Sequence, residues 1–137
     1  MLRGFWQREG ELIDADDIAG AAGLNVATWL GPEASQATRE RVRLMQRHAL
    51  EVRLAAPQEY EPAEVAVDLG AITAVGLVVS GAKDLPDFGL IAARLAALLP
   101  GTRQVELPWA VHLPTLERPQ ELSGILSAFL REIVPAG

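Results

Sequence analysis

Cysteine is missing from the 137 residues of this chain, and histidine occurs only twice. The absence of cysteine excludes disulfides, thiol catalysis and thiolate metal sites. With two histidines as the remaining nitrogen ligands, we expect neither a metal site nor a bound cofactor. Aromatic residues make up only 5% of the chain, so a hydrophobic core must be built from aliphatic side chains and alanine.

Positive charge and long apolar runs are also scarce. Lysine and arginine together number 12, against 18 aspartates and glutamates, which gives a formal net charge of −6. This balance argues against nucleic acid and anionic membrane surfaces as partners. The longest apolar run, residues 71–82, is shorter than the about 20 residues that a membrane-spanning helix needs. We therefore predict a cytoplasmic protein without nucleic-acid or membrane partners.

The first part of the chain, residues 1–56, has the pattern of a helical region. A helix is predicted over residues 18–30, because three aspartates precede it and Gly-Pro follows it. A second helix begins near Ser35 or Thr38, either of which is a suitable cap. Residues 54–66 contain two prolines and several acids, which favours a linker or hinge. The second helix carries apolar residues at spacings of three and four: Val42, Met45, Ala49 and Val52.

Residues 65–137 follow a different pattern, in which two short strands alternate with two helices. The apolar run 75–80 does not alternate with polar residues, which is typical of a strand covered on both faces of a parallel sheet. A helix over 86–99 and a strand over 104–107 come next. This order predicts a right-handed crossover and the α/β fold class. A last helix with Pro119 near its start has one continuous apolar face: Leu122, Ile125, Leu126, Phe129, Leu130 and Ile133.

Two polar residues follow the predicted strands at the edge where parallel sheets collect their sites. Asp84 lies in the loop after the first strand, and His112 lies in the loop after the second. A carboxylate that holds the Nδ1–H of a histidine leaves Nε2 free to accept a proton from a nucleophile. Two simpler interpretations stay open: Asp84 or Asp87 caps the following helix, and His112 has no chemical role.

Two longer segments resemble the α/β-hydrolase family. Residues 72–88, ITAVGLVVSGAKDLPDF, are similar to its last-but-one strand and acid loop. Residues 99–122, LPGTRQVELPWAVHLPTLERPQEL, are similar to its final strand, histidine loop and last helix. The match runs over residues 65–137 and implies that Asp84 is the triad acid and His112 the triad histidine. Small esterases and lactonases of the enol-lactonase type are the most similar members.

The resemblance also gives a role to residues 1–64, which are similar to the helical lid of this family. It implies a partial α/β-hydrolase fold, with the lid followed by a parallel β-α-β-α unit, and a small ester or lactone as substrate. We predict that Trp29, Val42, Met45 and Trp109 bind this substrate. The alternative interpretation is that these side chains pack the lid and the core.

The family's nucleophile does not occur in this sequence. The family carries a serine in a G-x-S-x-G turn before the acid and the histidine, and none of the four serines here lies in that context. We therefore expect the chain to be inactive alone and to need an N-terminal half that supplies the serine. The alternative is a non-catalytic module for self-association or partner binding. We also expect a homo-oligomer, because a two-stranded sheet is marginally stable and leaves open edges.

Overall fold

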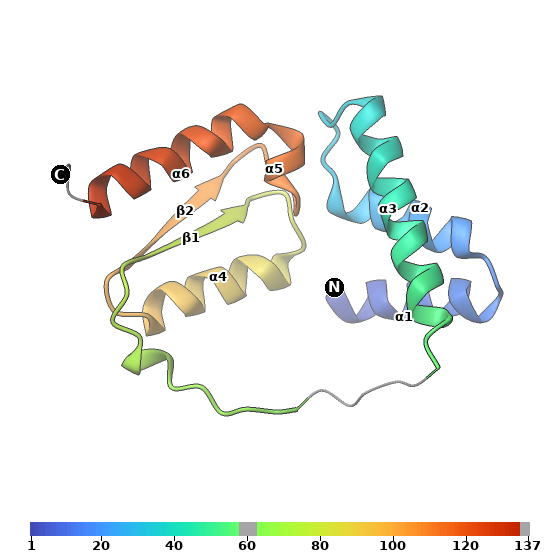
Figure 1. Ribbon diagram of the computed structural model, residues 1–137, viewed down its shortest axis with the longest axis horizontal. Coiled ribbons are helices and arrows are strands. Elements are labelled where there is room, and N and C mark those ends of the chain that lie inside the picture. The colour runs from blue at the N-terminus through green and yellow to red at the C-terminus, as the bar shows by residue number, and fades with distance from the viewer. Residues whose placement is uncertain (58–62, 135–137) are drawn as a thin grey trace.

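The computed structural model describes residues 1–57 and 63–134 (Figure 1). An N-terminal helical region contains α1 (Leu2–Asp14), α2 (Ile18–Trp29) and α3 (Gln36–Leu54). A βαβα region follows, with η1 (Leu69–Ala71), β1 (Gly76–Gly81), α4 (Pro86–Leu98), β2 (Thr102–Leu107), α5 (Pro114–Glu117) and α6 (Pro119–Ile133). The predicted linker includes residues 58–62, which lie outside the described residues. None of the helices in the described ranges is both long and apolar enough to cross a bilayer.

Side-chain caps set the starts of α2 and α3. The Asp17 carboxylate accepts a hydrogen bond from the backbone N–H of Gly20 at 2.8 Å. The Ser35 hydroxyl accepts one from the backbone N–H of Thr38 at 3.0 Å, so Ser35 is the cap of α3. Each such cap satisfies one of the free N–H groups at a helix start and is worth about 1 kcal/mol. Trp29 is the last residue of α2.

The buried face of α3 differs from the predicted apolar stripe. Val42 and Leu50 are buried, eight residues apart, whereas Met45, Ala49 and Val52 are exposed. Val42 packs in a cluster with residues of α2 and of the loop after it: Val26, Leu30 and Ala34. The stripe prediction was therefore right at Val42 and wrong at the other three positions. A spacing of three and four residues is compatible with more than one face of α3. The packing of α3 against α2 decides which face is buried.

The sheet consists of β1 and β2, which run parallel and pair from Gly76 with Thr102 to Gly81 with Leu107. This confirms the predicted strand–helix–strand crossover, with the first strand one residue later and the second two residues longer than expected. Figure 1 shows α4 on one side of the strands and α6 on the other. On the α6 side, the core contains a single cluster: Val79, Val105, Leu107, Trp109, Ala110, Leu122 and Ile125.

Part of the apolar face predicted for the last helix is not covered. Leu122 is buried and Ile125 is half-buried, both in the first half of α6. Leu126, Leu130 and Ile133 are exposed instead. Phe129 is half-buried, with the Arg103 guanidinium over its ring. The predicted face is therefore covered at three of its six positions and exposed at the other three.

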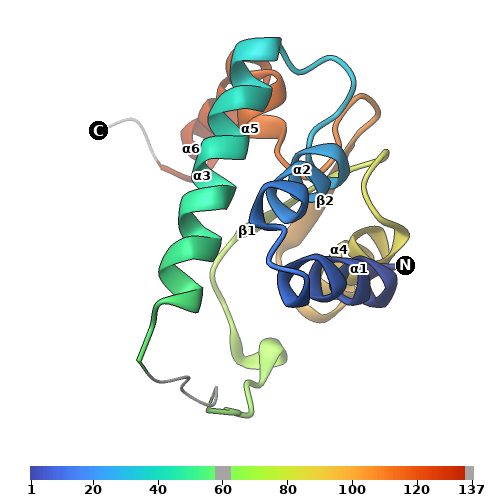
Figure 2. The same ribbon diagram turned by 90° about the vertical axis from the view of Figure 1, so that its right-hand side faces the viewer.

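The helical region lies beyond the carboxyl ends of the two strands (Figures 1 and 2). Polar contacts at two places attach it to the βαβα region. The backbone N–H of Leu2 in α1 donates to the Asp87 carboxylate in α4 at 3.2 Å, and this bond lowers the pKa of Asp87. Arg118 donates to Glu33 in the α2–α3 loop, which lowers the pKa of Glu33 and raises the pKa of Arg118. The helices are thereby held over the ends of the strands.

Candidate active site

Asp84 is placed by the loop that follows β1. The backbone N–H of Ala82 donates to the Leu107 carbonyl at 2.9 Å, and that of Lys83 donates to the Ala110 carbonyl at 3.0 Å. These bonds join the loop after β1 to the end of β2 and its following loop. The Asp84 side chain is only 6% exposed, and its Oδ1 accepts from the backbone N–H of Leu85 at 2.7 Å.

The helix-capping interpretation of Asp84 and Asp87 is not what the structure shows. Leu85 occupies the cap position of α4, and no side chain makes a cap hydrogen bond there. Asp87 lies inside the first turn, with Pro86 as the first helical residue. Its carboxylate accepts from Leu2 of α1 instead. The second carboxylate oxygen of Asp84, Oδ2, has its partner outside α4.

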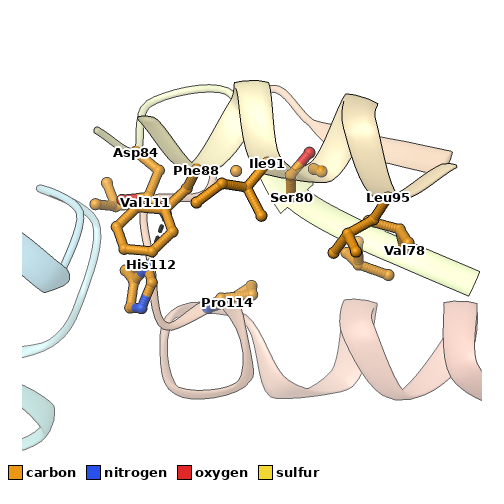
Figure 3. Close-up of a pocket in the computed structure, with 12 residues that line it drawn as sticks. Val78, Ser80, Asp84, Phe88, Ile91, Leu95, Val111, His112 and Pro114 are labelled. Atoms are coloured by element: carbon orange, nitrogen blue, oxygen red, sulfur yellow. Dashed lines mark hydrogen bonds and ion pairs between the residues drawn. The ribbon is translucent and has the colours of Figure 1, made fainter. Parts of the chain in front are cut away.

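That partner is His112, in the loop after β2. The distance from His112 Nδ1 to Asp84 Oδ2 is 2.7 Å (Figure 3). Because a carboxylate only accepts hydrogen bonds, the proton between them belongs to Nδ1. This tautomer leaves Nε2 with a lone pair, and the His112 side chain is 35% exposed. The structure therefore brings together the two residues predicted from the sequence, and part of the imidazole stays exposed.

Two aromatic rings contact the imidazole. The ring centroid of Phe88 in α4 lies 4.3 Å from that of His112, and the centroid of Trp29 in α2 lies 4.7 Å from it. Trp29 and Phe88 also contact each other, with centroids 5.9 Å apart. The imidazole thus contacts one aromatic ring from the helical region and one from the βαβα region.

An open cavity of about 220 Å³ borders the pair. Figure 3 shows Asp84, Phe88 and His112 at one end of it and Val78 and Leu95 at the other. Its lining is mainly apolar and comes from β1, α4 and the histidine loop: Val78, Val79, Ser80, Gly81, Asp84, Phe88, Ile91, Ala92, Leu95, Val111, His112 and Pro114. The cavity is therefore an apolar trough along β1 that ends at an acid and a base.

The four predicted substrate-binding residues do not gather at one place. Trp29 contacts His112 directly. Val42 is buried in the helical cluster, and Met45 is 56% exposed on α3. Trp109 donates through Nε1 to Glu121 at 2.7 Å and packs in the core under α6. None of the four lines the trough, so the structure brings only Trp29 to the acid and the base.

Serine 80 is the serine nearest to the pair along the chain, at the end of β1. Its side chain lines the trough and is buried. The Ser80 hydroxyl accepts a hydrogen bond from Gln104 at 3.4 Å. This confirms the sequence prediction that Ser80 belongs to the strand that precedes Asp84.

Three residues with a structural part in the site were not singled out from the sequence. Phe88 lies in the helix predicted over residues 86–99, and no role was predicted for it. Glu117 accepts from the backbone N–H of Val111 at 3.1 Å and so fixes the histidine loop. Asn25 accepts from Trp29. Glu117 and Asn25 are polar residues inside helices, and only tertiary contacts distinguish them from solvent-facing ones.

Metal ligands do not cluster in the part of the chain that the structure describes. No group of three or more histidine, aspartate or glutamate side chains there could hold a metal ion.

The solved structures that are similar to this chain are of the α/β-hydrolase type, and the chain spans about half the length of each. A scan against models of known families finds no match, and no curated protein matches the chain. A hydrolase from Pseudomonas aeruginosa PA01 is similar over 94% of this chain and 50% of its own, with 29% identity and a TM-score of 0.68.

Two further solved structures have the same partial overlap. Est816, described as an N-acyl homoserine lactone degrading enzyme, is 24% identical over 88% of this chain and 50% of its own, with a TM-score of 0.61. The non-heme bromoperoxidase BpoC from Mycobacterium tuberculosis H37Rv is 21% identical over 97% and 53%, with a TM-score of 0.63. These likenesses agree with a partial α/β-hydrolase fold: helices followed by a short parallel sheet.

Proposed function

We propose that this chain supplies the acid and the base of a serine hydrolase that cleaves small esters or lactones. The observation that carries the proposal is the 2.7 Å contact between His112 Nδ1 and Asp84 Oδ2 at the ends of two parallel strands. The nucleophilic serine and the oxyanion donors come from polypeptide outside these 137 residues. Residues 1–64 act as the lid, and residues 65–137 belong to the catalytic core.

The geometry supports a defined path for the proton. Nε2 of His112 takes the proton from the serine hydroxyl as its oxygen attacks the substrate carbonyl carbon. The Asp84 carboxylate, 6% exposed, stabilises the imidazolium and keeps Nδ1 protonated. When the acyl–oxygen bond breaks, Nε2 gives the proton to the departing alkoxide. Water then releases the acyl group by the same two proton transfers.

The substrate class rests on the chemistry of this pair and on the structural neighbours. One neighbour is described as degrading an N-acyl homoserine lactone. A lactone and a small ester present the same acyl carbon, so both are suitable. Of the four residues predicted to bind the substrate, we assign this role to Trp29 alone. We add Phe88, which was not among the four. Both rings are next to the imidazole.

A complementation assay tests this function. The chain is mixed with the portion of the Pseudomonas aeruginosa hydrolase that it does not span, and turnover of p-nitrophenyl butyrate and of a short N-acyl homoserine lactone is measured. We expect no turnover from either part alone and turnover from the mixture. His112→Ala should remove this turnover, and His48→Ala, on an exposed part of α3, should retain it.

Turnover by this chain alone that survives His112→Ala would contradict the proposal, because it would place the chemistry elsewhere. A second check is the DNA upstream of the Met1 codon. The proposal expects it, or a separate gene, to encode a G-x-S-x-G segment.

Self-association is the alternative function, and the exposed apolar side chains favour it. Within the described residues β1 pairs only with β2, so its other edge is open. Leu126, Leu130 and Ile133 are exposed on α6. An open edge and an uncovered apolar face are the features through which chains pair with copies of themselves.

The self-association model predicts a dimer in light scattering, with twice the 14.7 kDa mass of the chain. Replacing Leu126 and Leu130 together by lysine should give a monomer, because two charges then occupy the apolar face. Ser127→Lys, also on α6 and exposed, is the matched control and should remain dimeric. A wild-type chain that stays monomeric at high micromolar concentration argues against self-association.

A further inference from the structure

A chain of buried polar contacts runs through the helical region to the histidine. Asn25 Nδ2 donates to Glu9 Oε1 at 2.5 Å and to the Ala21 carbonyl at 3.0 Å. Asn25 Oδ1 accepts from Trp29 Nε1 at 2.8 Å. Trp29 then contacts the imidazole of His112. Glu9, Asn25 and Trp29 are only 6%, 5% and 8% exposed, so the contacts are shielded from water.

The orientation of the Asn25 amide is fixed by these partners. The indole N–H is a donor only, and the Glu9 carboxylate and the Ala21 carbonyl are acceptors. A flipped amide would place its NH2 group against the indole N–H and its oxygen against the carboxylate. Breaking a buried bond of this kind leaves an unsatisfied polar group and is unfavourable. The rotamer of Trp29 is therefore set by a hydrogen bond from within its own helix.

The histidine needs such support because a single bond to Asp84 leaves the tilt of its ring open. His112 lies in a loop, and its ring contacts Trp29 and Phe88 at 4.7 and 4.3 Å. Phe5 of α1 packs on Trp29, with centroids 4.5 Å apart. The imidazole is thus bounded by rings whose own positions are fixed by α1, α2 and α4.

We propose that Asn25 is a positioning residue of the site. Its amide is held by Glu9 and Ala21 and in turn holds the Trp29 indole. In this way the helical region fixes the plane of the His112 ring. This inference rests on the proposed function for its catalytic meaning, but the positioning itself is a property of the chain alone. Held side chains of this kind give a base the orientation that proton transfer requires.

Nuclear magnetic resonance of the 137-residue chain tests the proposal without any turnover. The chain has two histidines and three tryptophans, so the His112 Nδ1–H and Trp29 Nε1–H signals are assignable by single substitutions. In Asn25→Leu we expect solvent exchange of Trp29 Nε1–H to accelerate by about tenfold, the factor that loss of one hydrogen bond gives. Exchange of His112 Nδ1–H should also accelerate, because its ring loses a fixed neighbour. His48 and the exposed Trp6 are internal controls and should not change.

Two further variants separate positioning from a loss of folding. Glu9→Gln keeps a carbonyl oxygen for the Asn25 amide and should behave as the wild type. In a Trp29→Phe background the indole N–H is gone, so Asn25→Leu should no longer affect His112. Trp29→Phe alone should already show the faster exchange at His112 Nδ1–H.

Unchanged exchange at His112 in a folded Asn25→Leu chain overturns the inference. If that variant does not fold, unchanged exchange in Trp29→Phe overturns it instead. An equal effect of Asn25→Leu with and without the Trp29 indole also overturns it, because Asn25 would then act by another route. In the complemented enzyme, Asn25→Leu should lower kcat/KM by about tenfold. An inactive mixture refutes the proposed function and leaves the resonance result to decide the positioning role.

Discussion

Replacing His112 by alanine in the complemented enzyme should lower kcat by about 10³–10⁴-fold, because the serine then loses its general base. Asp84→Asn should lower kcat by a similar factor. An asparagine can present an NH2 group to Nδ1, which favours the tautomer protonated on Nε2, the atom that must accept the proton. The KM for the ester should change little, because neither change removes the Trp29 or Phe88 ring. Steady-state kinetics with a chromogenic ester measures both constants.

Asp87→Asn is the matched control for Asp84→Asn. Asp87 lies three residues further along and bonds to Leu2 of α1, not to the histidine. We therefore expect Asp87→Asn to retain most of the activity. If Asp84→Asn and Asp87→Asn lower kcat equally, Asp84 has no specific role in the proton transfer, and the proposed relay is wrong.

The meeting of Asp84 and His112 could be predicted because it follows from topology. A strand–helix–strand unit places the ends of both strands at one edge of the sheet, and each residue is in the loop just after its strand. The resemblance to a hydrolase then indicated which two of the many polar residues matter. The 2.7 Å distance agrees with that expectation. The catalytic role itself stays a prediction.

The contacts that surround the pair could not be predicted in the same way. Asn25 and Glu9 are polar residues in helices, and a hydrophobicity pattern places such residues at the surface, yet both are buried. Trp29 was a candidate binding residue like Trp109, but one indole faces the histidine and the other faces Glu121. These choices depend on how helices pack on one another, and single-chain periodicity does not contain that information.

Gly81, the last residue of β1, lies against the backbone of the loop that carries His112. A Cβ atom at this position would lie 2.1 Å from the Val111 carbonyl oxygen and 2.4 Å from the Ala110 carbonyl oxygen. Both oxygens are backbone atoms, and the Ala110 carbonyl is held by Lys83 at 3.0 Å. The clash cannot be relieved by a side-chain rotation, so the loops would have to separate.

Gly81→Ala should therefore lower the free energy of unfolding by about 3 kcal/mol, at the upper end of overpacking effects. That is a large part of the stability of a small domain. Because Val111 precedes His112, we also expect the Asp84–His112 hydrogen bond to weaken, seen as faster exchange of His112 Nδ1–H. Urea unfolding followed by circular dichroism gives the free energy.

Gly89→Ala in α4 is the control, since a Cβ there meets nothing within 4 Å. It should raise the stability by about 1 kcal/mol, because alanine loses less backbone entropy in a helix than glycine does. The two substitutions make the same chemical change, so the difference between them isolates the contact between the loops. Equal effects of Gly81→Ala and Gly89→Ala would mean that the loops do not touch, and the acid and the base would then lack the rigid backbone that holds them together.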